Sequence, residues 1–332
     1  MSNPITWGII GCGDVVEKKS GPAIMQAGNS RIAGVMRRNP QKAESFASVH
    51  SIPLCTDDPE AILRHPEIDI VYVATPPSSH REYVVAAAAS GKHVLVEKPM
   101  GLSTSEDDEM IAACASAGVE LFVAYYRRFH PHVLQMKELI ARGRIGEPVF
   151  AQIDFSQAPS PHTAWGGGWR VQPKISGGGL FVDVVSHRID AMVSLLGAPM
   201  RVQGLKRSFL PQSRVEDVIA LAVEFADGTL CSINGDFASK RSADRFMIVG
   251  TDGVIESERL DGHAFTVCAG GREETLQFDP FPAPHLGLIR HIEQVLRCET
   301  ANACSGVDGR WTDWILDRAL GRVSENGDPI KP

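Results

Sequence analysis

The first 125 residues alternate short apolar runs with segments of helical pattern, and this alternation constrains the fold more than any other feature. The runs predict strands at Ile5–Gly11, Arg31–Met36, Ile68–Thr75, His93–Glu97 and Val119–Tyr125, with helices between them at Pro40–Val49, Ser79–Ser90 and Ser103–Ala117. Strands that alternate with helices predict βαβ units and a parallel sheet. Right-handed crossovers make a doubly wound α/β sheet the expected topology of a first domain, residues 1–125.

The pattern changes after about Arg128, and residues 126–332 are expected to form a second, α+β domain. Helices are predicted at Pro131–Arg142, Gly179–Leu196, His285–Cys298 and Val307–Val323, and strands at Pro148–Ser156, Ile219–Phe225, Leu230–Asp236, Phe246–Gly250, Gly253–Glu258 and Phe265–Cys268. Asp227-Gly228 between two of these runs is a strong hairpin signal. Successive strands with tight turns predict a mainly antiparallel sheet.

Length and composition bound the class of protein. The 332 residues exceed what one core usually serves, which favours two domains. A net charge of −7 argues against a nucleic-acid or anionic-membrane partner. The seven cysteines show no CxxC spacing, so free thiols in a reducing compartment are expected. The chain enters a strand directly and has no apolar run of roughly 20 residues, so we expect a cytoplasmic protein.

A glycine-rich turn follows the first predicted strand. Gly11 permits a tight turn, and Gly13 lets backbone amides approach a pyrophosphate at the start of the next helix. Val16 stands where the usual fingerprint has a third glycine. An ordinary strand–helix turn is the alternative, but the position in a βαβ series favours a dinucleotide. The residues expected to contact it are Gly11, Cys12, Gly13, Asp14 and Val15.

Two arginines end the second predicted strand. Sites for NAD place a carboxylate there to bind the ribose 2′-hydroxyl, whereas an arginine can pair with a 2′-phosphate. Arg37 and Arg38 therefore favour NADP, with NAD possible. The alternative is a pair of solvated arginines ahead of a helix.

A proline-containing loop follows the next strand at the same edge of the sheet. It contains Thr75, Pro76 and Pro77, with His80 at the start of a helix. The prolines rigidify the turn. We expect these residues, His80 included, to line the path of the cofactor, and we expect His80 to be a first-turn residue rather than a catalytic one.

The Glu97-Lys98-Pro99 sequence places an ammonium group at the carboxyl end of a buried strand. Ligands of open parallel sheets bind beyond the carboxyl ends of the strands. Lys98 is therefore expected where cofactor and substrate meet. The alternative is a solvated loop lysine.

Asp183, His187 and Asp190 share one face of an otherwise apolar predicted helix. Polar groups in such a helix require partners, because burying them unpaired is costly. A structural Asp–His pair in the core is one alternative to catalysis. A metal site is another, but no HExxH pattern or cysteine ligand supports it, so no metal is expected.

Together these motifs resemble the Gfo/Idh/MocA oxidoreductases. The resemblance covers essentially the whole chain and includes Ala74-Thr75-Pro76-Pro77, Tyr126-Arg127-Arg128-Phe129 and Trp169-Arg170. It implies a Rossmann domain followed by an α+β domain whose open sheet often serves oligomerisation, so a homodimer or homotetramer is expected. It also implies that Lys98 is the motif lysine and that Asp183 and His187 are the catalytic pair. Val16 and Arg37 depart from the family pattern.

The resemblance and the residues predict an NAD(P)-dependent oxidoreductase, with NADP favoured, acting on a sugar, polyol or related cyclic alcohol. His187 is the expected acid/base, because histidine titrates near neutral pH. Further cofactor contacts are expected from Glu97, Lys98, Trp169 and Arg170, and substrate contacts from Lys98, Tyr126, Arg127, Trp165, Asp183 and His187. The alternatives are a glycoside-cleaving enzyme that oxidises its substrate transiently with a tightly bound nicotinamide, and a non-catalytic dinucleotide sensor.

Overall fold

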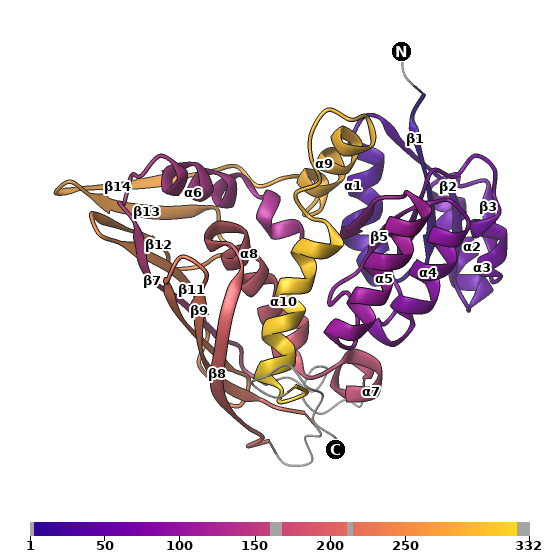
Figure 1. Cartoon of the computed structure of the whole chain (residues 1–332). Helices are drawn as coiled ribbons and strands as arrows, with labels where there is room; N and C mark the ends of the chain where they lie inside the picture. Colours follow the sequence, from indigo (N-terminus) through magenta and orange to yellow (C-terminus); the bar gives the residue numbers. More distant parts are fainter. Residues whose placement is uncertain (1–2, 160–167, 211–214, 324–332) are drawn as a thin grey trace. The chain divides into compact units, whose positions relative to one another are not determined.

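The computed structural model describes residues 3–159, 168–210 and 215–323, and the chain divides into two compact units (Figure 1). The first unit comprises Met1–Tyr126 and Phe281–Arg310, and the second comprises Arg127–Pro280 and Trp311–Pro332. The expected second domain comprises all of residues 126–332. The structure differs in that Phe281–Arg310 returns to the first unit.

The first unit contains a six-stranded parallel sheet, which confirms the predicted doubly wound fold. Its strands are β1 (Ile5–Ile10), β2 (Ser30–Met36), β3 (Leu54–Thr56), β4 (Ile70–Val73), β5 (His93–Val96) and β6 (Leu121–Val123), in the order β3-β2-β1-β4-β5-β6. Every residue of β1 is buried, as expected for a strand covered on both faces. The sequence analysis missed β3, because its three half-buried residues form no apolar run.

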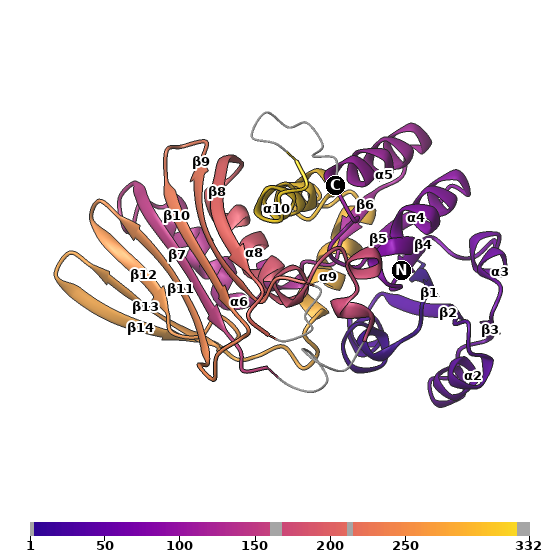
Figure 2. The same ribbon diagram turned by 90° about the horizontal axis from the view of Figure 1, so that it is seen from below.

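Helices lie on both sides of this sheet (Figure 2). They are η1 (Val16–Ser20), α1 (Gly21–Gln26), α2 (Pro40–Val49), α3 (Pro59–Leu63), η2 (Pro77–Ser79), α4 (His80–Ala89), α5 (Thr104–Ala117) and α9 (Leu286–Leu296). Local chemistry sets their ends. The Asn39 side chain caps α2 by accepting from the Lys42 amide, and the Ser103 side chain caps α5 by accepting from the Glu106 amide.

Polar contacts hold the returning segment to the first unit. Glu293 of α9 accepts hydrogen bonds from the Ser30 hydroxyl at 2.6 Å and the Asn29 amide at 3.1 Å. Asn302 donates to Glu120 at 2.9 Å. The helical pattern of this segment was recognisable in the sequence, but periodicity alone does not show which sheet a helix joins.

The second unit contains an eight-stranded, mainly antiparallel sheet, as predicted. Its strands are β7 (Pro148–Ser156), β8 (Pro199–Arg207), β9 (Val218–Phe225), β10 (Leu230–Asp236), β11 (Ala243–Gly250), β12 (Gly253–Ser257), β13 (Ala264–Ala269) and β14 (Arg272–Gln277), in the order β14-β13-β12-β11-β7-β10-β9-β8. Only the β7–β10 pair among these is parallel. The two edge strands, β8 and β14, were not predicted, because most of their residues are exposed and neither strand alternates regularly between apolar and polar residues.

Helices cover one face of this sheet. The helical segments are η3 (Tyr126–Phe129), α6 (Pro131–Ala141), η5 (Trp169–Val171), α7 (Pro173–Ser176), η6 (Phe181–Val185), α8 (Ser186–Leu196) and α10 (Gly306–Ala319). The first residue of η3 and the first five of α10 belong to the first unit. The core of the unit joins apolar residues of α6, α8 and the end of α10 to the inward side chains of the strands. The predicted helix Gly179–Leu196 begins as the π-helix η6 and continues as α8.

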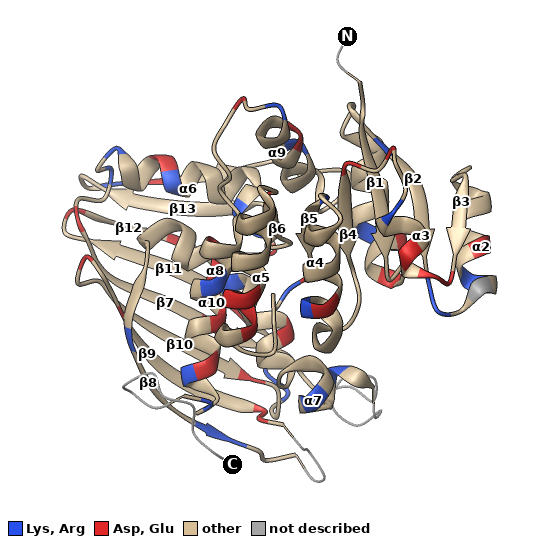
Figure 3. Ribbon diagram, turned by 45° about the vertical axis from the view of Figure 1, so that its right-hand side comes forward, with Lys and Arg blue, Asp and Glu red and all other residues tan. Residues whose placement is uncertain are grey.

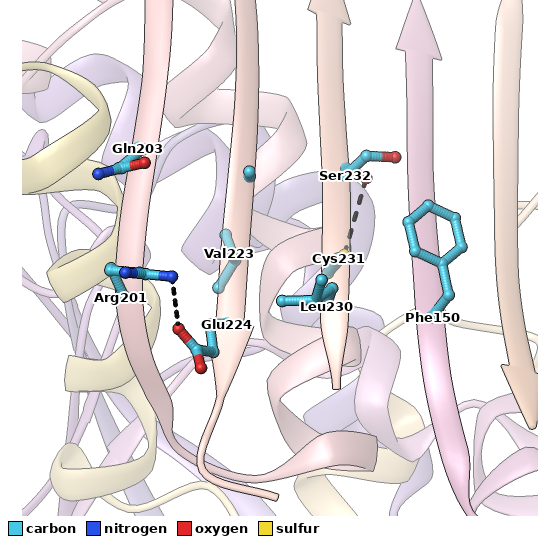
Figure 4. Close-up of a pocket in the computed structure, with 9 residues that line it drawn as sticks. Phe150, Arg201, Gln203, Val223, Glu224, Leu230, Cys231 and Ser232 are labelled. Atoms are coloured by element: carbon cyan, nitrogen blue, oxygen red, sulfur yellow. Dashed lines mark hydrogen bonds and ion pairs between the residues drawn. The ribbon is translucent and has the colours of Figure 1, made fainter. Parts of the chain in front are cut away.

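The opposite face of the sheet is open. Inward residues of β9 are buried, whereas Ala220 and Ala222 between them are exposed. Phe150 and Leu230 are paired in register on β7 and β10 and stand on this face beside the Arg201–Glu224 ion pair of 3.1 Å (Figure 4). A shallow pocket lies here, and none of its lining residues is a predicted site residue.

The view in Figure 3 shows basic and acidic residues interspersed along the helices and strands of each unit. Within the described parts of the chain, every helix is too short or too polar to serve as a transmembrane span.

Candidate functional site

The glycine turn after β1 leaves room for a phosphate. Gly11 has a φ of +95°, and a Cβ there would lie 2.7 Å from the Ala74 carbonyl oxygen, so the position requires glycine. The amides of Gly11 and Cys12 donate to the Met36 carbonyl oxygen at 3.0 and 3.1 Å, which ties the turn to β2. A Cβ on Gly13 would meet nothing closer than 3.8 Å. The turn therefore fits a pyrophosphate at the start of a helical segment.

Val16, the departure from the glycine fingerprint, is fully buried and is the first residue of the π-helix η1. Gly21 at the start of α1 packs so closely that a Cβ there would lie 2.6 Å from the Val16 carbonyl oxygen. Both residues belong to the helical segment that runs from η1 into α1, so this contact is internal to the segment and does not replace the close helix–strand approach that the third glycine usually permits.

The other residues of the turn differ in their exposure. Burial raises the pKa of the Cys12 thiol to about 12, so this cysteine stays protonated and is no nucleophile at neutral pH. Asp14 is largely exposed and accepts from Lys18 at 3.1 Å. The Val15 carbonyl oxygen accepts from the Ser20 hydroxyl at 3.2 Å. Contact of Asp14 and Val15 with a cofactor stays a prediction.

At the end of β2, an arginine pairs with a carboxylate from η1. Arg37 Nη1 lies 3.0 Å from Glu17 Oε1, and the two side chains are 22% and 38% exposed. Arg38 is exposed beside it. The predicted arginine is thus present at the carboxyl end of β2, but it is paired with Glu17, which was not among the predicted site residues.

The loop after β4 is held by a buried histidine. His80 Nε2 lies 2.8 Å from the Thr75 carbonyl oxygen, and Nδ1 lies 3.0 Å from that of Met100. The imidazole therefore connects the loop that contains Pro76 and Pro77 to the segment after β5. His80 is the first residue of α4, where the sequence analysis expected it. A direct contact of this loop with the cofactor stays a prediction.

Glu97 lies buried at the end of β5 beneath Lys98. Its Oε1 accepts from the Tyr72 hydroxyl at 2.5 Å and lies 3.8 Å from His285 Nε2, and its Oε2 accepts from the Lys98 amide at 3.2 Å. Burial by itself would raise the pKa of Glu97, but His285, Lys98 and the Tyr72 hydroxyl lower it to about 2. An ionised carboxylate therefore fixes the backbone from which the half-buried Lys98 side chain projects.

Lys98 and the glycine turn belong to one edge of one sheet. The strands β1, β4 and β5 are neighbours and parallel, so the segments that follow them meet at their carboxyl ends. Gly11, Thr75 and Lys98 are the residues that follow these strands closely. This is the edge at which ligands of doubly wound sheets bind.

The predicted polar face of the second unit spans the point at which a π-helix continues as an α-helix. Asp183 lies in the π-helix η6, and the buried His187 lies in the first turn of α8. Asp183 Oδ2 accepts from Arg170 Nε at 3.1 Å, and the Arg170 guanidinium stacks 4.6 Å from the Trp169 ring. π-Turns within helices are frequent at functional sites.

Asp190, the third member of that face, has a structural partner. Both Asp190 and Arg128 are buried, and Arg128 donates to both carboxylate oxygens. Arg127, expected to contact substrate, donates through Nε and Nη2 to Asp261 at 2.5 and 2.9 Å. Both arginines thus bind carboxylates of their own unit.

Arg188, next to His187, was not among the predicted site residues, but it fixes the position of α8. It is fully buried, pairs with Asp244 at 2.9 Å and Asp261 at 2.6 Å, and stacks 4.4 Å from the Phe155 ring. The two charged hydrogen bonds and the ring contact hold α8 against the sheet.

Of the two aromatic residues expected to contact substrate, only Tyr126 lies within the described residues. The Tyr126 ring is buried and packs against the His285 ring, with centroids 4.3 Å apart and planes tilted by 34°, and Lys19 Nζ lies 5.7 Å from the Tyr126 centroid. Trp165 lies outside the described residues. Across 3–159, 168–210 and 215–323, no cluster of three or more His, Cys, Asp or Glu side chains is suited to a metal ion.

Tyr72 and His285 have no signal in the sequence that would have singled them out. Tyr72 lies inside a buried strand, where an aromatic residue normally indicates core packing. His285 comes from the returning segment, so only the three-dimensional structure brings it to Glu97.

Comparison with known proteins agrees with this architecture. Residues 5–125 match the family model described as "Oxidoreductase family, NAD-binding Rossmann fold", and residues 133–256 match the "GFO/IDH/MocA C-terminal domain". The chain is 34% identical over 321 residues to "Oxidoreductase P35" of Formosa agariphila, which covers 96% of this chain and 98% of that protein. It is 29% identical to "1,5-anhydro-D-fructose reductase" of Ensifer adhaerens over 75% of this chain and 74% of that protein.

A solved structure shares the whole fold. The aldose-aldose oxidoreductase from Caulobacter crescentus, complexed with glycerol, superposes with a TM-score of 0.87 at 24% identity and covers 99% of this chain and 100% of that chain. At this identity the match establishes the fold.

Proposed function

Because the chain belongs to the Gfo/Idh/MocA oxidoreductase family, we propose that it transfers hydride between a nicotinamide cofactor and a secondary alcohol or ketone of a sugar, polyol or related cyclic alcohol. One observation carries the proposal: the open glycine turn after β1 and the lysine after β5 occupy the same edge of one parallel sheet. The 1,5-anhydro-D-fructose reductase relative supports a sugar-like substrate.

Different residues of the chain are proposed to bind the pyrophosphate and the 2′-phosphate of the cofactor. The open space at Gly13 suits the pyrophosphate, and Arg37 with Arg38 would pair with a 2′-phosphate, so NADP is favoured. Bound there, the nicotinamide would supply or accept the hydride. Trp169 and Arg170, which stack on each other, are proposed as further cofactor contacts.

Three side chains are proposed for the proton chemistry. His187 takes the hydroxyl proton during oxidation and returns it during reduction, as a positioned general acid/base. Asp183 orients the imidazole or a substrate hydroxyl. The ammonium of Lys98 stabilises charge that develops on the substrate oxygen. Lys98 belongs to the first unit, whereas Asp183 and His187 belong to the second.

The decisive assay follows nicotinamide absorbance over a panel of sugars and polyols with both NAD and NADP. His187→Ala should lower turnover at least ~100-fold, the scale of lost acid–base catalysis, while cofactor binding by tryptophan fluorescence persists. Near-normal turnover in that variant would remove His187 from the mechanism. Glycoside cleavage without added cofactor would favour transient oxidation instead, and binding with no turnover on any substrate would favour a sensor.

A further inference from the structure

The Glu17–Arg37 ion pair joins the glycine turn to the end of β2. Glu17 lies in η1, and its amide donates to the Gly13 carbonyl oxygen at 3.0 Å. The Arg37 amide donates to the Thr56 carbonyl oxygen at 3.1 Å. Both backbones are therefore fixed by the sheet and the turn, and the 3.0 Å contact joins side chains that are still partly exposed.

This place in a doubly wound sheet discriminates between the two nicotinamide dinucleotides. A carboxylate there accepts from the ribose 2′-hydroxyl, whereas an arginine binds the 2′-phosphate. The chain presents one side chain of each kind, and the carboxylate comes from η1 rather than from the end of β2. Glu17 offsets the charge of Arg37 and would repel a phosphate dianion, yet it can accept from a hydroxyl.

The middle residue of the glycine turn experiences both charges. After burial, which has the largest effect, Glu17 raises and Arg37 lowers the pKa of the Cys12 thiol. The ion pair thus lies close to the turn proposed to hold the pyrophosphate.

We infer that Glu17 is a specificity-determining residue of the dinucleotide site, whose carboxylate restrains the preference of Arg37 for a 2′-phosphate and permits binding of NAD as well. The inference rests on the proposed function, since it concerns the same cofactor. When NADP binds, Arg37 leaves Glu17 and pairs with the 2′-phosphate. When NAD binds, Glu17 accepts from the free hydroxyl.

The test uses two probes that lack the nicotinamide, so it does not depend on turnover. Calorimetry measures the dissociation constants of AMP and adenosine 2′,5′-bisphosphate for the full-length chain. Glu17→Gln should raise the preference for the bisphosphate at least about fivefold, because Arg37 is released and a repulsive charge is removed. Arg37→Gln should abolish that preference.

The matched control is Glu67→Gln, which removes the carboxylate of the exposed Arg31–Glu67 pair, also 3.0 Å long, near the other end of β2. It makes the same change in net charge and should leave the preference unchanged. A Glu17→Gln variant with the wild-type preference, or a Glu67→Gln variant with the same gain, would overturn the inference while leaving the proposed function intact. Failure of the wild-type chain to bind either nucleotide would overturn both.

Discussion

At the scale of single residues, the structure explains why a glutamate precedes the proposed catalytic lysine. Glu97 is a buried anion held by the Tyr72 hydroxyl and by His285, and it accepts from the Lys98 amide. Burying an unpaired carboxylate would be costly, so these partners are required for folding as well as for the shape of the loop. His285 links this loop to the returning segment.

The lowered pKa of Glu97 predicts a specific dependence of stability on pH. The pKa falls from 4.5 to about 2 on folding, so the unfolded chain binds the proton more readily in this window. The contribution of Glu97 to the free energy of unfolding is therefore complete above about pH 5. It is lost as the pH falls towards 2, and the loss amounts to about 3 kcal/mol. Denaturant unfolding at successive pH values should show a shallower acid loss in Glu97→Gln than in the wild type. Parallel curves would contradict the assigned ionisation.

At the scale of elements, the helix that carries Asp183 and His187 is clamped by charges on several segments. Arg188 on α8 binds Asp244 and Asp261, and Asp261 also binds Arg127. Despite its burial, the two arginines hold the pKa of Asp261 well below its ordinary value. One carboxylate thus binds two guanidinium groups, and Asp244 supplies a second negative charge to Arg188.

Removing that carboxylate should loosen α8. Asp261→Asn leaves Arg127 and the fully buried Arg188 without much of their neutralising charge, so the free energy of unfolding should fall by about 3 kcal/mol. Denaturant titration measures it. Asp154→Asn leaves only the 55% exposed Arg241 side chain without its partner, so it should cost less than about 1 kcal/mol. Equal losses in the two variants would show that Asp261 has no special role.

The sequence predicted elements well where the pattern is local, and it failed where partners come from afar. Buried strands such as β1 and β5 have continuous apolar runs, so their places were recognisable. The edge strands β8 and β14 lack that pattern, because solvent covers much of them. Periodicity placed Asp190 with His187 on one face, but it could not show that Arg128 neutralises Asp190. Nor could it show that η6 is a π-helix.

At the scale of the whole molecule, the open face of the eight-stranded sheet is not covered by any described helix of its own unit. Phe150 and Leu230 lie side by side on the central strands β7 and β10. They are 38% and 52% exposed, and Glu224 pairs with Leu230 in register from β9. Adjacent exposed apolar side chains flanked by charged ones are typical of protein interfaces. We therefore propose that this face joins copies of the chain into a dimer or tetramer.

A charge in the middle of that face should separate the copies. Leu230→Asp would place a second carboxylate opposite Glu224, and this carboxylate would be buried in the interface. The dissociation constant of the oligomer should therefore rise at least about tenfold. Light scattering coupled to size exclusion, over a dilution series, measures the change in mass. Val49→Asp, at a residue 74% exposed on α2, is the control and should leave the mass unchanged. A monomeric wild-type chain, or a Leu230→Asp variant with the wild-type mass, would exclude this face as the interface, because an aspartate cannot be buried there without a partner.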